Sequence, residues 1–163
     1  TEVCAGHQPS VDDSKRRTHM NGSIPEKAQE LLKERFGHDT LIALATVTDG
    51  IPSVRTVNSY YEDGKFYVIT YAKSAKMKQI EANPNTAVSG DWFSAHGKGM
   101  NLGWFGKSEN RDIAVKLRHV FKDWIDNGHN NFDDENTVIL CIQLTDGTLF
   151  SHGTRYDLDF SEK

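Results

Sequence analysis

Three strand-like runs joined by two short turns constrain the fold of this chain more than any other feature. The runs are rich in β-branched and aromatic residues, and they read "TLIALATVT" (40–48), "IPSVRTVNSYY" (51–61) and "KFYVITYA" (65–72). Asp49-Gly50 and Asp63-Gly64 divide them, and Asp-Gly is a strong hairpin signal because both residues tolerate positive φ. The sequence therefore predicts a three-stranded antiparallel meander.

Helix-like segments precede and follow this meander. Ser23 and Glu26 have the spacing of a capping box, and apolar residues then recur at helical spacing up to Gly37: Ile24, Ala28, Leu31, Leu32 and Phe36. A second, shorter helix is expected from Ser74 to about Glu81. A long third helix is expected from about Glu109 to a stop at Gly128, with one apolar face: Ile113, Leu117, Val120, Phe121 and Trp124.

The remaining segments predict further strands. "TAVSGDWF" (86–93) is expected to be the fourth strand, and the glycine-rich "SAHGKGMNLGWFGKS" (94–108) a loop or an irregular hairpin. "TVILCIQL" (137–144), "TDG" and "TLFSHGTRYD" (148–157) are expected to form a last hairpin. About six strands in antiparallel clusters, rather than repeated βαβ units, predict a mainly β fold: a small antiparallel barrel with flanking helices.

Length and composition limit the function. A chain of 163 residues suits one domain, which we place at 20–163. Residues 1–19 lack periodicity, and because the chain opens on Thr1, we expect them to be a disordered tail or a remnant of expression ahead of Met20. The 19 basic and 23 acidic residues are interspersed, which disfavours nucleic-acid and membrane partners. No secretory signal or bilayer-length apolar stretch is seen, so a soluble, cytoplasmic protein is expected.

Several classes of active site find no support. Cys4 and Cys141 indicate no disulfide framework, and Cys141 is most simply a buried strand residue. The histidines include no pair at metal-ligand spacing, so no metal site is expected. The Gly97-x-Gly99 segment opens no helix within a βαβ unit, which sets aside a dinucleotide fold.

Positive charge collects where the third strand gives way to the second helix. Lys73, Lys76 and Lys78 fall within six positions of a chain whose net charge is −4. A helix N-terminus attracts anions, and Ser74 and Lys76 would add a hydroxyl and a formal charge. An ordinary solvated helix start is the simpler explanation, although lysines are unfavourable so close to a helix N-terminus.

Arg55 is the second candidate for anion binding. Strand alternation places it on one face with Val57 and Ser59, so it is expected to point somewhere partly enclosed. An enclosed guanidinium needs an anionic partner, because an unpaired buried charge is costly. From the residues alone, that partner is either a carboxylate of the protein or a bound phosphate.

The order of these pieces resembles the pyridoxamine 5′-phosphate oxidase-like family, the FMN-binding split barrels that include bacterial general stress proteins. The resemblance is closest between Leu41 and Trp92. It rests on an R-x-V strand, a D-G turn, an apolar strand ending in Thr, an S-x-K helix start and N-P before the next strand. Each piece is weak alone, but the ordered set is specific. It implies a split β-barrel homodimer with FMN bound at the subunit interface.

The resemblance also implies which residues bind the cofactor. Arg55 would contact the FMN phosphate, while the backbone of Thr56, Val57 and Asn58 would face the ring system. Ile69 and Thr70 would line the ribityl chain and phosphate, and Ser74 and Lys76 would complete the phosphate site. Many family members have a second basic residue before that lysine, where this chain has Ala75. FMN affinity is then reduced unless Lys73 replaces the missing contact.

The implied function is two-electron flavin chemistry on an unidentified small molecule, and the general stress proteins in the family suggest a link to stress. No general acid or base can be named from the sequence. The alternatives are a non-catalytic flavin- or haem-binding protein and a deazaflavin-dependent reductase on the same barrel. The acidic C-terminus, "SHGTRYDLDFSEK", with Arg155 as its only arginine, speaks against pyridoxine phosphates as substrates, because negative charge there repels a dianion.

Overall fold

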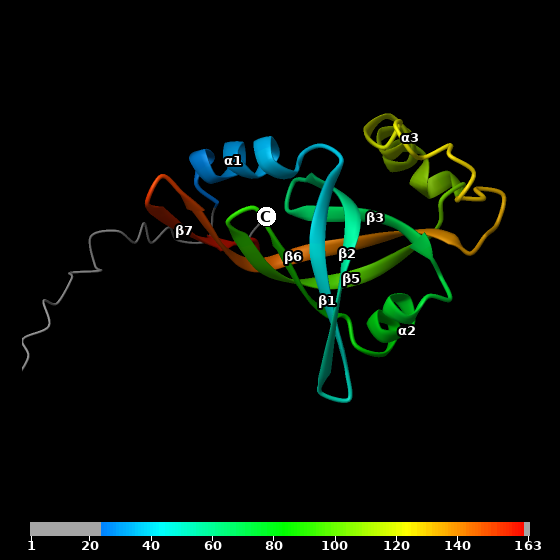
Figure 1. Ribbon diagram of the computed structural model, residues 1–163, viewed down its shortest axis with the longest axis horizontal. Helices are drawn as coiled ribbons and strands as arrows, with labels where there is room; N and C mark the ends of the chain where they lie inside the picture. The colour runs from blue at the N-terminus through cyan, green and yellow to red at the C-terminus, as the bar shows by residue number, and fades with distance from the viewer. Residues whose placement is uncertain (1–23, 162–163) are drawn as a thin grey trace, which may run out of the picture.

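A closed barrel of six antiparallel strands forms the body of the protein (Figure 1). The computed structural model describes residues 24–161. The barrel strands are β1 (Thr40–Thr48), β2 (Ile51–Glu62), β3 (Lys65–Tyr71), β4 (Asn85–Gly90), β5 (Phe93–Trp104) and β6 (Thr137–Ser151). They follow one another in the order β3-β2-β1-β4-β5-β6, and β6 pairs back onto β3 to close the barrel. A seventh strand, β7 (Thr154–Asp159), pairs only with the end of β6. The predicted antiparallel barrel is confirmed.

The predicted meander is also confirmed, and its turns have the expected geometry. Asp49 and Gly50 have φ of 51° and 76°, and Asp63 and Gly64 have φ of 47° and 79°. Both residues of each turn are thus left-handed, as tight two-residue hairpins require. The strands on either side pair without a gap, Thr48 with Ile51 and Glu62 with Lys65.

Three α-helices pack around the barrel: α1 (Glu26–Phe36), α2 (Ala75–Ala82) and α3 (Arg111–Val120). Helix α1 begins at Glu26 after Pro25 and has no side-chain cap, so Ile24 lies before it and is only partly buried. The other predicted apolar residues are buried in the helix: Ala28, Leu31, Leu32 and Phe36. Ser23 and the predicted tail (1–19) lie outside the described residues. Helix α2 covers the barrel end beside the β1–β2 hairpin, where it packs against β1 and β5 (Figure 1). None of the described helices is long and apolar enough to cross a membrane.

Most of the glycine-rich segment expected to be a loop or an irregular hairpin belongs to strand β5, whose pairing with β6 contains two register shifts. Its glycines reflect close packing rather than a turn. A Cβ on Gly97 would lie 2.9 Å from the Gln143 carbonyl oxygen, and one on Gly99 would lie 2.8 Å from Ile80 Cγ2. Because the β6 backbone lies against Gly97 and the Ile80 side chain of α2 lies against Gly99, any larger residue would force a neighbour to move, and the prediction of a loop was wrong.

The last hairpin turns later than expected. "TDG" does not turn, because β6 runs through it as a single strand of 15 residues. A register shift accommodates this segment, since His96 pairs with Asp146 but Gly97 pairs with Leu144. The turn instead falls at His152 and Gly153, whose φ values are 47° and 75°. The predicted turn position was therefore wrong. The predicted barrel of about six strands is confirmed, and a seventh strand lies outside it.

Helix α3 is shorter than predicted, although its apolar face continues. A short 3-10 turn at Ser108–Asn110 precedes the helix. The helix ends at Val120 rather than near Gly128. Phe121 and Ile125 remain buried in the turns that follow. The apolar periodicity therefore predicted the burial of Phe121 correctly, but it did not predict that the backbone beyond Val120 leaves the helical conformation.

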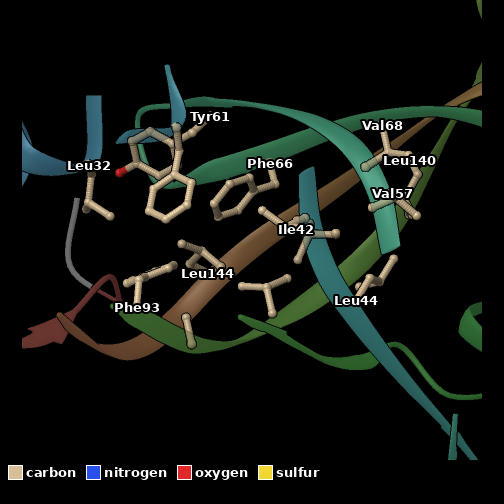
Figure 2. Packing of buried hydrophobic residues seen from close by; sticks show 14 of the residues in the cluster. Leu32, Ile42, Leu44, Val57, Tyr61, Phe66, Val68, Phe93, Leu140 and Leu144 are labelled. Atoms are coloured by element: carbon tan, nitrogen blue, oxygen red, sulfur yellow. The ribbon is translucent and has the colours of Figure 1, made fainter. Parts of the chain in front are cut away.

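The core has two parts. The larger part fills the barrel, where Ile42, Phe66 and Leu144 converge from opposite walls (Figure 2). The smaller part lies between the barrel and α3 and includes Leu117 and Phe121. Cys141 is 2% exposed on β6, which confirms its prediction as a buried strand residue.

Candidate functional site

The two candidate regions named from the sequence meet at the barrel end covered by α2. Arg55 lies on β2 opposite Leu44 of β1, on the face that also carries buried Val57 and Ser59. Its side chain is half-buried and runs toward α2, whose Gln79 it contacts. The prediction of a partly enclosed guanidinium is thus confirmed.

Every hydrogen-bond partner of Arg55 is neutral. Its Nη1 donates to Thr46 Oγ1 at 2.7 Å and, at longer range, to the carbonyls of Leu44 (3.3 Å) and Ser53 (3.4 Å). Its Nη2 donates to Gln79 Oε1 at 3.1 Å. In the described part of the chain no carboxylate forms a salt bridge with this guanidinium. Of the two partners left open by the sequence, a carboxylate of the described chain is therefore not the one used.

Lys76 adds a second cation to the same place. It precedes Gln79 by three residues on α2, so the two side chains share a helix face. Lys76 is half-buried, whereas Lys73 and Lys78 are exposed. Burial lowers the pKa of Lys76, and the nearby charge of Arg55 lowers it further. Burial likewise lowers the pKa of Arg55.

Ser74 contributes an unused hydroxyl. It is the N-cap residue of α2, as predicted, but its side chain makes no capping bond. Its Oγ is buried and has no hydrogen-bond partner among the described residues, as is also the case for the hydroxyls of Thr48 and Thr86. A buried polar atom without a partner is rare and costly, and the first N–H groups of a helix also lack partners within the helix.

The residues expected to face a flavin ring are spread over both faces of β2. Val57 points into the core and is 9% exposed, so only its backbone could meet a ligand. Thr56 and Asn58 are exposed on the outer face. Asn58 Nδ2 donates to Asp39 Oδ1 at 3.1 Å, and the other oxygen of that carboxylate accepts from Trp124.

Ile69 and Thr70 lie on β3 and have different surroundings. The Ile69 side chain packs against the smaller core cluster under α3, away from Arg55. Thr70 alternates onto the same face as core residues Phe66 and Val68, at the end of β3 that leads to α2. The structure therefore brings the charges of Arg55 and Lys76 close to each other and places Ser74 at the start of the same helix as Lys76. Thr70 and Ile69 lie on opposite faces of β3.

Thr46 and Gln79 belong to this site and were not identified from the sequence. Two signals could have revealed them. Thr46 continues the inward-facing series of Ile42 and Leu44, so a polar residue there needs a partner. Gln79 lies three residues after Lys76, on the same helix face.

Two cavities lie elsewhere on the protein. One, of about 500 Å³, is a shallow groove on the outer sheet face, lined by small residues such as Ala45 and Ala87 and edged by His96. The His96 Nδ1 lies 2.7 Å from Asp146 Oδ1, and both side chains are exposed. The other, of about 760 Å³, lies between α1 and the β2–β3 turn. Neither is lined by Arg55.

Known proteins share both the sequence pattern and the fold. Residues 24–145 match the pyridoxamine 5′-phosphate oxidase family. General Stress Protein 26 from Bacillus anthracis str. Sterne superposes with a TM-score of 0.58 at 21% identity, over 80% of this chain and 98% of that one. No curated protein matches the chain.

Two further solved structures show what else carries this fold. An FAD-binding protein from Mesorhizobium loti has a TM-score of 0.55 at 19% identity, over 72% of this chain and 90% of its own. A heme-binding protein from Mycobacterium smegmatis has a TM-score of 0.56 at 12% identity, over 76% of this chain and 54% of its own. Because the family match spans most of the sequence, this chain belongs to the pyridoxamine 5′-phosphate oxidase-like split-barrel family.

Proposed function

We propose that this protein is an FMN-dependent oxidoreductase and that Arg55, Ser74 and Lys76 bind the cofactor phosphate. The observation that carries the proposal is the pair of half-buried cations, Arg55 and Lys76, with no carboxylate partner in the described chain. Like charges brought together raise the energy of the folded protein unless an anion offsets them.

A phosphate dianion matches the other features of this site. It accepts several hydrogen bonds, so it can satisfy the unpartnered Ser74 hydroxyl and the free N–H groups at the start of α2. The helix dipole favours an anion at that position as well. Arg55 and Lys76 supply the charge-assisted bonds, while the exposed Lys73 is the remaining candidate for the contact that Ala75 cannot make.

When bound, the flavin would supply the redox chemistry by accepting and passing on two electrons. The chain's own residues would bind and orient it: Arg55 and Lys76 fix the phosphate, and the exposed backbone edge around Thr56 and Asn58 offers a surface for the ring. Thr70 lies where the ribityl chain would join the two. No side chain stands out as a general acid or base for the substrate.

We further propose that the site is completed by a second copy of the chain. The groove on the outer face follows a row of paired residues, Val54, Ala45, Ala87 and His96, across β2, β1, β4 and β5. Val54 is 70% exposed and directly precedes Arg55. Small side chains and an exposed valine suit a packed interface. A partner lying there would cover the outer face of β2, which also carries the exposed Thr56 and Asn58.

The substrate is not expected to be a pyridoxine phosphate. Arg155, the one arginine of the C-terminal strand, already donates from Nε to Asp157 Oδ1 at 2.9 Å. We expect no pyridoxal phosphate or hydrogen peroxide from pyridoxine 5′-phosphate or pyridoxamine 5′-phosphate under air, even with FMN fully bound. Turnover near the median enzyme rate of about 10 per second would contradict this.

The second candidate is a non-catalytic flavin- or haem-binding protein. It is favoured by the absence of an identified acid or base in the described site and by the heme-binding neighbour. A deazaflavin-dependent reductase is a third possibility on the same fold. The absorption spectrum of the purified protein separates these: flavin bands support the first proposal, and a Soret band the second. Bleaching of the flavin absorption by NADH or NADPH then distinguishes an enzyme from a flavin-storage protein.

A further inference from the structure

Gln79 makes a pair of hydrogen bonds that fixes both its own amide and the guanidinium of Arg55. Its Oε1 accepts from Arg55 Nη2 at 3.1 Å and also from the Thr46 hydroxyl. That hydroxyl in turn accepts from Arg55 Nη1 at 2.7 Å. Since a guanidinium can only donate, the amide must present its oxygen, and the three side chains close a ring of hydrogen bonds.

We propose that Gln79, together with Thr46, is a positioning residue for anion binding: it orients Arg55 but leaves its positive charge for the ligand. The proposal rests on the function proposed above, because the anion it serves is the cofactor phosphate. It assigns a role to two residues that do not themselves contact the phosphate.

The shape of the guanidinium shows what remains for the ligand. Thr46 and Gln79 are bonded to each other and bind Nη1 and Nη2, so they occupy the edge between these two nitrogens. The adjacent edge, formed by Nε–H and the second N–H of Nη2, has no partner among the described residues. This edge can bind an oxyanion through two parallel hydrogen bonds.

The neutral charge of Gln79 is as important as its position. A glutamate would have nearly the same shape and could accept the same two hydrogen bonds. It would, however, form an ion pair with Arg55 and also offset the charge of Lys76. The protein without ligand would gain stability, and the phosphate would lose attraction. An amide at this position is therefore what keeps the site cationic.

The test compares Gln79→Glu with Lys78→Gln, which makes the same change in net charge at an exposed position of the same helix. FMN and inorganic phosphate are titrated into each full-length protein by calorimetry, and the Tm is measured without ligand. We expect Gln79→Glu to raise the Tm and weaken FMN by about tenfold or more, as for loss of a charge-assisted bond. Lys78→Gln should leave both near the wild-type values.

A third variant, Gln79→Met, separates positioning from charge. It keeps the length of the side chain but not the hydrogen bonds, so FMN should weaken while the Tm does not rise. Equal FMN affinity in the wild type and Gln79→Glu would overturn the inference and leave the proposed function standing. A fall in both Tm and affinity in Gln79→Glu would also overturn it, because a merely structural role predicts that. A wild type that binds neither FMN nor phosphate would overturn both proposals.

Discussion

The two ends of the barrel are covered by helices of opposite character (Figure 1). At the α1 end, Phe36 lies 5.6 Å from Phe66 and 5.3 Å from Phe93 between ring centroids, and all three rings are buried. Figure 2 shows Leu32 and Tyr61 beside these rings. The Arg35 guanidinium at this end donates to two backbone carbonyls.

At the α2 end the interior is polar and incompletely satisfied. Helix α2 buries only Met77 and Ile80. Beside them lie the cationic Arg55 and the hydroxyls of Thr48 and Thr86, which have no partner in the described chain. Proteins break the rules of packing and hydrogen bonding mainly where function requires it. The comparison therefore supports the proposal that the α1 end stabilises the fold and the α2 end binds the ligand.

The largest expected effect is a loss of stability at the α1 end. Phe36→Ala should lower the free energy of unfolding by about 3–5 kcal/mol, because it removes a fully buried ring and leaves a cavity. Urea denaturation measures this. A loss below about 1 kcal/mol, as at an exposed surface site, would contradict the assignment of stability to this end.

Sequence reasoning predicted the α1 end and the meander well because local signals determine them. Helical spacing identified Leu32 and Phe36, and Asp-Gly pairs identified the two hairpins. It failed at Gly97, because glycine marks a turn and a close backbone contact equally well, and only the packing of β6 against it distinguishes them.

The site was predicted in part for a similar reason. Arg55 and Lys76 carry charge, so their residue types alone raise the question of a partner. Thr46 and Gln79 are neutral, and their role depends on contacts between β1, β2 and α2 that are far apart in the sequence. The proposed contribution of a second copy depends on another chain, which no local pattern can specify.

The next largest effect concerns the proposed interface. FMN should stabilise the dimer by linkage, by about 2.7 kcal/mol at a free concentration one hundred times its Kd. Val54→Asp should weaken dimerisation and FMN binding together, because it places a charge in the proposed interface on the outer face of β2. Val115→Asp is the matched control, since Val115 is 64% exposed on α3. Sedimentation that shows monomeric Val54→Asp with wild-type FMN affinity would rule out the shared site.

A smaller effect separates the lysines of the α2 end. Lys76→Ala should weaken FMN by about 1.5–3 kcal/mol, the range for a hydrogen bond to a charged group. Lys78→Ala should change the affinity little, because Lys78 is exposed to solvent. Fluorescence titration of FMN measures both. Equal affinities would return Lys76 to the role of an ordinary solvated helix residue.

The smallest effect is a pH dependence that belongs to Lys76. Its pKa is lowered from 10.5 in the folded protein, first by burial and then by Arg55. A phosphate binds the protonated lysine, so FMN affinity should fall as pH rises through that lowered pKa. Lys76→Arg should not show this decrease, because arginine stays charged throughout the range. The same decrease in both proteins would assign the pH dependence to FMN or to another group.

Without ligand, Lys76 has the opposite pH effect: the stability of the protein rises with pH, whereas the FMN affinity falls. A lysine whose pKa is lower in the folded state costs stability while it is protonated, and that cost disappears as pH rises through the lowered pKa toward 10.5. Burial raises the pKa of Tyr61 and Tyr67 to about 12, so these tyrosines make the fold lose stability above pH 10.

Because Lys76→Arg retains both tyrosines, the difference in Tm between wild type and variant isolates the lysine. We expect the wild type to gain stability relative to Lys76→Arg as the pH rises toward 10, and to lose that gain when saturating FMN holds Lys76 protonated. A difference in Tm that stays constant with pH would show that Lys76 does not differ from the solvated lysines of α2.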